Sequence, residues 1–227
     1  MMNRTLMIMA KAPRVGSVKT RLAGSLSLEE VTELYGCFLD DTIALVRSLQ
    51  SVEVSIMCPE SDVDALSRSV REAVRIVPQG GQGLAAGLTS VFAGFTNSGR
   101  HRVIAFNSDS PHLPAWMLER AFDMLETCDL VVGPTYDGGY YLVGAKAPYP
   151  GLFANDGMGT GIALEVLLTR ARERGLSIAL ADRFYDIDIA KDLSQLADEL
   201  ERAPGRAPRT AKWLADRANV RHRQSQC

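Results

Sequence analysis

The chain has 227 residues, of which 46% are hydrophobic, and 25 Lys and Arg stand against 27 Asp and Glu, which gives a net charge of −2. This size and composition predict one globular domain, and the near-neutral charge gives no argument for nucleic-acid or membrane-surface binding. No apolar run approaches the roughly 20 residues that a membrane-spanning helix needs, and no signal-peptide pattern opens the chain. Four widely spaced cysteines without a C-x-x-C pair predict the reduced thiols of a cytoplasmic protein.

Helical and strand patterns alternate along the chain, which predicts an α/β protein with a mostly parallel sheet covered on both faces. Ser27 and Glu30 have the spacing of a capping box and mark the start of a long helix. A hairpin-like stretch after Gly133 predicts a mixed sheet in the second half. In chain order, strands are expected at 6–10, 52–58, 73–77, 102–106, 130–133, 140–144 and 177–180, with a further strand end at 186–188, and helices at 28–49, 61–71, 84–95, 114–126, 161–173 and 190–202.

The segment 11–22, which follows the first apolar strand, is the most informative part of the sequence. It carries four cations and no acid among Gly, Ser and Thr residues, and the first acid of the chain is Glu29. Backbone N–H groups and a helix N-terminus after such a loop can face an anion, while Lys and Arg neutralise its charge. The segment therefore predicts an anion site, although a surface loop without a ligand can also be basic.

Three aspartates are candidate metal ligands. Asp109 follows the apolar strand 102–106, and in open α/β sheets ligands bind beyond the carboxyl ends of the strands. A carboxylate there can bind Mg²⁺ or Mn²⁺ together with phosphate oxygens, whereas the alternative is that Asp109 caps the following turn or helix. Asp186 and Asp188 point to one face if they lie on a strand, so one of them can complete a metal site with Asp109. The alternative for this pair is a solvent-exposed strand edge.

Two glycine-rich segments are candidate ligand loops. Asp137-Gly138-Gly139 permits positive φ and a close backbone approach, which by itself marks only a hairpin turn. The segment 81–87 follows a strand, opens a helix and precedes Asp109 by 22 residues, which partly matches a dinucleotide-binding fingerprint. Its G-x-G-x-x-x-G spacing and the unexplained basic segment argue against a nicotinamide enzyme.

The C-terminal region is basic. Residues 202–223 hold six Arg and one Lys against the single acid Asp216. A short helix at 210–218 within a solvated tail is expected, and a nucleic-acid-binding arm is the less favoured alternative.

Four segments in this order resemble a bacterial family of GT-A-like glycosyltransferases (the DUF2064 type), related to 2-phospho-lactate guanylyltransferases and molybdenum-cofactor nucleotidyltransferases. The resemblance covers about residues 5–200. The segments are 11–22, Ser108-Asp109-Ser110-Pro111-x-Leu113, Gly133-Pro134-x-x-Asp137-Gly138-Gly139-Tyr140-Tyr141-Leu142-x-Gly144, and Asp186-x-Asp188 followed by Asp192-Leu193.

This resemblance implies a three-layer α/β/α sandwich of the nucleotide-diphospho-sugar transferase type, with one domain over 1–203 and a basic helix and tail over 204–227. It also implies the role of each site residue. Nucleotide contacts are expected from Lys11, Arg14, Gly16, Lys19, Thr20, Arg21, Gly83 and Leu84, metal ligation from Asp109, Asp186 and Asp188, catalysis from Asp109 and Lys19, and an acceptor pocket from Asp137, Gly138, Gly139 and Tyr140.

The function implied first is a Mg²⁺- or Mn²⁺-dependent transferase that uses a nucleotide-sugar donor on an unknown small-molecule acceptor. A nucleotidyltransferase of the guanylyltransferase kind, joining an NTP to a small phosphorylated acceptor, is the alternative. Both chemistries stabilise developing phosphate charge with the same residues. A non-catalytic nucleotide-binding protein that keeps the fold is the second alternative.

Overall fold

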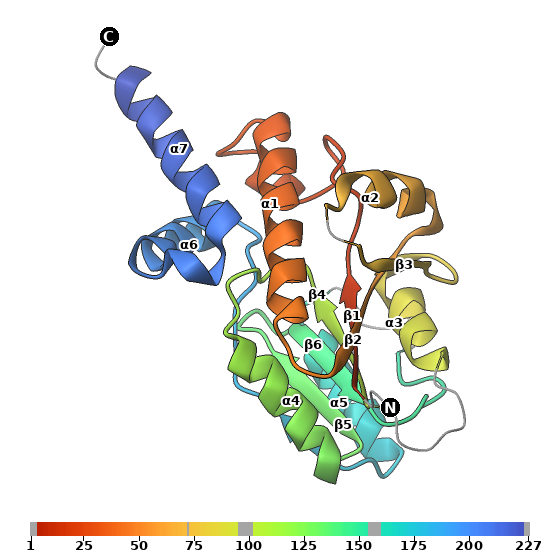
Figure 1. The fold of residues 1–227 in the computed structure, drawn as a ribbon. Coiled ribbons are helices and arrows are strands. Elements are labelled where there is room, and N and C mark those ends of the chain that lie inside the picture. The colour runs from red at the N-terminus through yellow and green to blue at the C-terminus, as the bar shows by residue number, and fades with distance from the viewer. Residues whose placement is uncertain (1–3, 72, 95–101, 154–159, 225–227) are drawn as a thin grey trace.

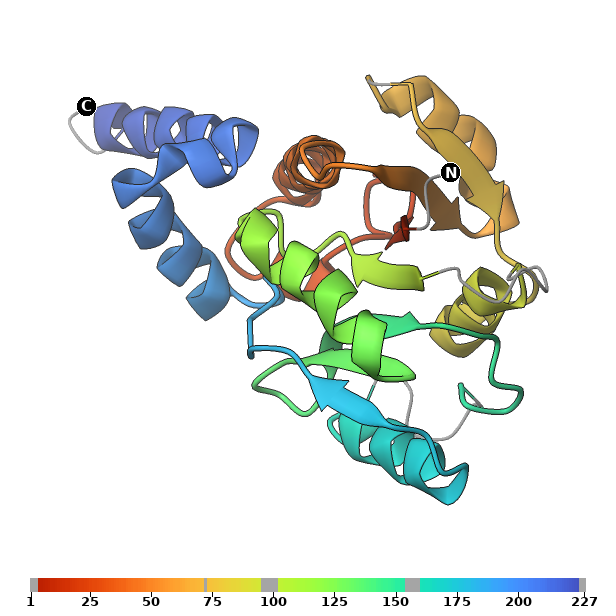
Figure 2. The ribbon, with the colours of Figure 1, turned by 60° about the horizontal axis from the view of Figure 1, so that its bottom comes forward.

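The computed structural model describes residues 4–71, 73–94, 102–153 and 160–224, in which one seven-stranded sheet lies between layers of helices (Figures 1 and 2). The strands are β1 (Arg4–Met9), β2 (Val52–Cys58), β3 (Arg75–Pro78), β4 (Arg102–Asn107), β5 (Leu130–Pro134), β6 (Tyr140–Ala145) and β7 (Ile178–Leu180). The α-helices are α1 (Leu28–Arg47), α2 (Val63–Ser69), α3 (Gly83–Ala93), α4 (Ala115–Thr127), α5 (Ala163–Glu173), α6 (Ala190–Arg202) and α7 (Pro208–Gln224). Short 3₁₀ helices lie at η1 (Thr20–Leu22), η2 (Glu60–Asp62) and η3 (Pro204–Arg206).

The sheet is mostly parallel and mixed, as the alternating pattern predicts. Its strand order is β3-β2-β1-β4-β6-β5-β7. Strands β3, β2, β1 and β4 pair in parallel, and β7 pairs in parallel with β5, whereas β6 is antiparallel to both β4 and β5. The carboxyl ends of β1 and β4 therefore meet at one edge, and the loops that follow these strands are neighbours.

Side chains alternate across the sheet and build a core on each face, which confirms the three-layer architecture. In β4, Ile104 and Phe106 join the core beneath α1, α2 and α4, while Val103 and Ala105 join the core beneath α3 and α5. This follows from the two-residue period of a strand. A strand buried on both faces explains the unbroken apolar run of β4.

The first helix begins where its capping box predicts. The Ser27 hydroxyl accepts from the Glu30 N–H at 3.1 Å, and the Glu30 carboxylate accepts from the Ser27 N–H at 2.7 Å. These reciprocal bonds satisfy two of the N–H groups at this helix N-terminus. The expectation that this helix end faces an anion stays a prediction.

The C-terminal helices form a third core with the N-terminal half of α1, and α7 lies beside α1 in Figure 1. The buried carboxylate of Asp41 accepts the backbone N–H groups of Arg209 and Thr210 at 3.1 and 2.8 Å. Arg217 Nε lies 2.7 Å from Glu30 Oε1. The helix expected at 210–218 in fact spans Pro208–Gln224 and packs against α1. Contacts with residues distant in sequence stabilise it, and local sequence preference does not record such contacts.

Other expectations differ in detail. No strand is present in 181–189, and the segment 186–188 follows β7 as irregular extended chain. Cys37, Cys58 and Cys128 are free thiols. Within the described ranges, no helix combines the length and apolarity needed to cross a membrane. The predicted helix end at 95 and the chain end 225–227, with its cysteine, lie outside the described residues, and the division of the chain at 203 stays a prediction.

Candidate active site

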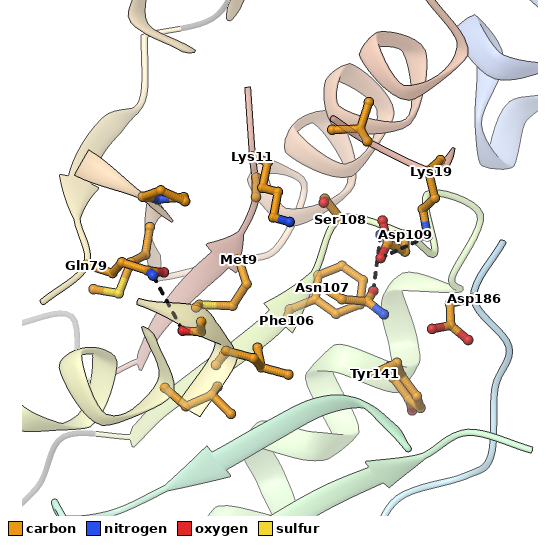
Figure 3. A pocket seen from close by; sticks show the side chains of 18 of the residues that line it. Met9, Lys11, Lys19, Gln79, Phe106, Asn107, Ser108, Asp109, Tyr141 and Asp186 are labelled. Atoms are coloured by element: carbon orange, nitrogen blue, oxygen red, sulfur yellow. Dashed lines mark hydrogen bonds and ion pairs between the residues drawn. The ribbon is translucent and has the colours of Figure 1, made fainter. Parts of the chain in front are cut away.

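A cavity of about 1030 Å³ opens at the carboxyl ends of β1 and β4 (Figure 3). One end is charged and contains Lys19 with three aspartates. The other end lies against the N-terminus of α3 and is lined by Met9, Met57 and Leu88. The cavity therefore has a polar end that can bind an anion and an apolar end that can bind a flat, apolar group.

Lys19 is the buried cation at the charged end. Its Nζ lies 3.0 Å from Asp109 Oδ2 and 2.6 Å from Asp188 Oδ1, and its side chain is only 7% exposed. Burial opposes the charge on Lys19, but Asp109 and Asp188 outweigh burial and raise its pKa above the ordinary value. Its backbone has φ of 45°, a conformation that non-glycine residues adopt only when the surroundings hold it.

The three aspartates fit a divalent metal ion. One carboxylate oxygen from each of Asp109, Asp186 and Asp188 lies within 4.8 Å of the others. Burial, and then the neighbouring Asp188 charge, raise the pKa of Asp186 to about 6. Three carboxylates against Lys19 and the exposed Arg21 leave excess negative charge among oxygen ligands, which is the chemistry that Mg²⁺ and Mn²⁺ prefer.

Two distant segments meet to place these carboxylates. The Ile187 N–H donates to the Asp109 carbonyl at 3.0 Å, and the Ser110 hydroxyl donates to the Tyr185 carbonyl at 3.1 Å. Ile187 is fully buried in the third core, so the aspartates on either side of it are directed toward Asp109. The predicted i, i+2 arrangement of Asp186 and Asp188 is thus present without a strand.

The basic segment is held partly by its own ion pairs. Arg14 contacts Asp62 Oδ1 at 3.0 Å and donates to the Ser61 carbonyl at 2.6 Å, and Asp62 also accepts the Ala12 N–H at 2.9 Å. Arg21 is 69% exposed and lies 3.6 Å from Asp188. Of the expected nucleotide contacts, the cavity is lined by Lys11, Lys19, Thr20, Arg21, Gly83 and Leu84, whereas Arg14 and Gly16 are not among its lining residues.

The β5–β6 turn holds the residues expected to form the acceptor pocket. Asp137 accepts the Thr135 hydroxyl at 2.5 Å and the Gly139 N–H at 3.2 Å, and the Thr135 bond is the main cause that lowers its pKa. Gly138 has φ of +87°, and a Cβ there would overlap the Gly161 carbonyl. Tyr140 lines the cavity, whereas Asp137, Gly138 and Gly139 are not among its lining residues.

Gly83 and Leu84, at the α3 end of the cavity, were expected from the sequence, but its apolar lining by Met9, Met57 and Leu88 was missed. Gln79 donates from Nε2 to the carbonyls of Gly81 and Gly83 at 3.2 and 3.4 Å. A Cβ on Gly87 would lie 2.8 Å from both Gln79 Oε1 and Met9 Cε. The glycines of this segment were the available signal, because they let α3 approach these side chains closely.

Comparisons with known proteins agree with this fold. The family described as "Uncharacterized protein conserved in bacteria (DUF2064)" matches residues 42–160. A 2-phospho-L-lactate guanylyltransferase from Methanothermobacter thermautotrophicus is 27% identical over 187 residues, 81% of this chain and 80% of that protein. A candidate nucleotide-diphospho-sugar transferase from Desulfovibrio desulfuricans G20 has a TM-score of 0.87 at 23% identity, covering 97% of both chains. A Mycobacterium tuberculosis H37Rv protein solved with manganese has a TM-score of 0.54 at 16% identity, covering 86% of this chain and 98% of that one. The fold is thus GT-A-like, that of nucleotide-diphospho-sugar transferases.

Proposed function

The chain belongs to the DUF2064 family, whose pattern spans just over half of it, and we propose that it is a metal-dependent transferase acting on a nucleotide. One observation carries this proposal. A buried lysine and three aspartates converge at the charged end of a cavity that continues into an apolar end. A nucleotide has the matching polarity, because its phosphates are anionic and its base is flat and largely apolar.

Different residues would bind the phosphates and the metal ion. Lys11, Lys19 and Arg21 are the cations that face the cavity, and they neutralise phosphate oxygens. Asp109, Asp186 and Asp188 would hold Mg²⁺ or Mn²⁺, which stabilises negative charge on phosphate oxygens when it is bound. Fixed charges in a partly buried site need little reorganisation as the reaction proceeds, so they stabilise the transition state.

Within this class we favour nucleotidyl transfer to an anionic acceptor. The sequence similarity to the guanylyltransferase extends over about four fifths of each protein. The exposed Arg21 lies beside Asp188 and contributes to lowering the pKa of Asp137, so it stands between the carboxylates and the β5–β6 turn. A cation there suits a phosphorylated acceptor, whose phosphate attacks the α-phosphate of an NTP while pyrophosphate leaves.

Glycosyl transfer from a nucleotide-sugar uses the same charged residues. In that case the acceptor attacks the anomeric carbon, and the nucleoside diphosphate leaves. Arg21 would then contact a neutral hydroxyl acceptor, to which a guanidinium forms a weaker hydrogen bond than it forms to a phosphate. The leaving group therefore separates the two reactions experimentally.

Calorimetric titration with GTP, CTP, UTP, ATP, UDP-glucose and GDP-mannose, in Mn²⁺ and in EDTA, tests the proposal. We expect an NTP to bind, and to bind more tightly in Mn²⁺. Release of pyrophosphate with a phosphorylated acceptor identifies nucleotidyl transfer, release of a nucleoside diphosphate identifies glycosyl transfer, and binding without turnover of any acceptor supports a nucleotide sensor. Absence of binding to all six compounds refutes the proposal.

Two aspartate variants make the metal assignment specific. Asp109→Ala removes one carboxylate of the cluster and is expected to abolish the gain in affinity from Mn²⁺. Asp198→Ala changes an exposed residue of α6 outside the cavity and is the matched control. If Asp109→Ala retains the full Mn²⁺ effect while folded, Asp109 is a structural residue.

A further inference from the structure

Tyr35 of α1 joins the two loops that build the charged end of the cavity. Its side chain is buried, and its hydroxyl accepts the backbone N–H of Lys11 at 3.1 Å. The same hydroxyl lies 3.0 Å from the Ser108 hydroxyl, next to Asp109. One phenol oxygen thus touches both the start of the basic segment and the turn that holds a candidate metal ligand.

The position of Tyr35 follows from where the sheet ends. The parallel pairing of β1 with β4 ends at Met9 and Asn107, and the next N–H, of Ala10, turns to the Met57 carbonyl of β2. Beyond that point the Tyr35 hydroxyl and the Lys19–Asp109 ion pair link the continuations of β1 and β4. They replace the ladder where the loops separate around the cavity.

Donor and acceptor are fixed for the first of these two hydrogen bonds. A backbone N–H can only donate, so the Tyr35 oxygen is the acceptor from Lys11. In the Tyr35–Ser108 contact either hydroxyl can be the donor, because both are buried and both line the cavity.

One hydroxyl proton of the Tyr35–Ser108 pair remains for a ligand, because the hydrogen bond between them uses only one of the two protons. Within the described ranges Ser108 Oγ has Tyr35 as its hydrogen-bonding partner, and Ser108 lines the cavity beside Asp109 (Figure 3). A hydroxyl that already accepts a hydrogen bond is a better donor, because successive bonds polarise one another. The remaining proton of this pair is suited to an anionic oxygen such as that of a phosphate.

We propose that Tyr35 is a positioning residue that couples the basic segment 11–22 to Asp109 through Ser108, so that nucleotide and metal ion bind cooperatively. This inference rests on the proposed function, since it requires both ligands. Lys11 and Asp109 move as a unit because one side chain fixes both loops. A phosphate bound on one side then finds the carboxylate on the other side already in place, which is the requirement for coupling.

The test is the ratio between the Kd measured in EDTA and the Kd measured in saturating Mn²⁺, using the NTP of the panel that binds most tightly. Tyr35→Phe removes only the hydroxyl, and Ser108→Ala removes its partner. Each variant is expected to lower this ratio about fivefold, the effect of losing one hydrogen bond between neutral groups. The double variant is expected to lower it no further, because both residues act in one chain of bonds.

Tyr149→Phe is the matched control, because Tyr149 interacts with Asp129 and does not line the cavity. A merely structural role of Tyr35 would weaken binding equally in EDTA and Mn²⁺ and leave the ratio unchanged. An unchanged ratio in Tyr35→Phe, or in Ser108→Ala where the first variant fails to fold, overturns the inference and leaves the proposed function standing. Additive effects in the double variant also overturn it, and a wild-type protein that binds none of the NTPs overturns both.

Discussion

His112 is expected to make the protein sensitive to acid. It is fully buried, and its ring centroid lies 4.8 Å from that of Phe184 and 4.7 Å from that of Tyr185. Neither ring nitrogen has a hydrogen-bond partner among the described residues. Glu199 lies 3.9 Å from Nε2. Burial lowers the pKa of His112 to about 4, although Glu199 acts in the opposite direction.

The sign and size of the effect follow from this pKa. In the unfolded chain His112 titrates near 6.5, so between 6.5 and 4 the unfolded state binds the additional proton. The free energy of unfolding keeps its full value above pH 6.5 and decreases as the pH falls through this window. At pH 5 the loss is about 2 kcal/mol, and it approaches about 3 kcal/mol below pH 4.

His112→Leu keeps a buried side chain of similar size and breaks no hydrogen bond among the described residues. Urea unfolding of wild type and variant at pH 5 and 7.5 gives the difference in their free energies of unfolding. Other titrating groups are common to both proteins and cancel. We expect this difference to shift by about 2 kcal/mol in favour of the variant at pH 5. A difference that stays constant between the two pH values refutes the reasoning.

Three further substitutions test separate parts of the fold. Asp41→Ala leaves the first N–H groups of α7 without their acceptor and is expected to lower the free energy of unfolding by about 1–3 kcal/mol in urea titration; unchanged stability would show that α7 docks without this bond. Gly87→Ala crowds the apolar end of the cavity and is expected to weaken NTP binding about tenfold by calorimetry, whereas Gly36→Ala, a helical glycine with open space around it, should leave binding intact. Gly138→Ala is expected to lower the thermal midpoint markedly, and a normal midpoint would mean that the turn rearranges without cost.

Local patterns were sufficient for the elements and for several site residues. The capping box of α1, the apolar strands and the β5–β6 hairpin follow from interactions between residues close in sequence, which local spacing records. The carboxyl-end rule also directed attention to Asp109 and to the loop of Lys19, since it depends on topology alone. The structure brings both into one cavity.

Only the tertiary structure decided which groups touch. Lys19 and Asp188 are 169 residues apart, and their contact depends on the third core that α6 and α7 build with α1. Tyr35 has the spacing of a core residue in a helix, so its hydroxyl gave no local signal of a bond to Lys11 or Ser108. Such partners are fixed by packing between distant segments, whereas residue type and spacing determine only which secondary structure each segment can form.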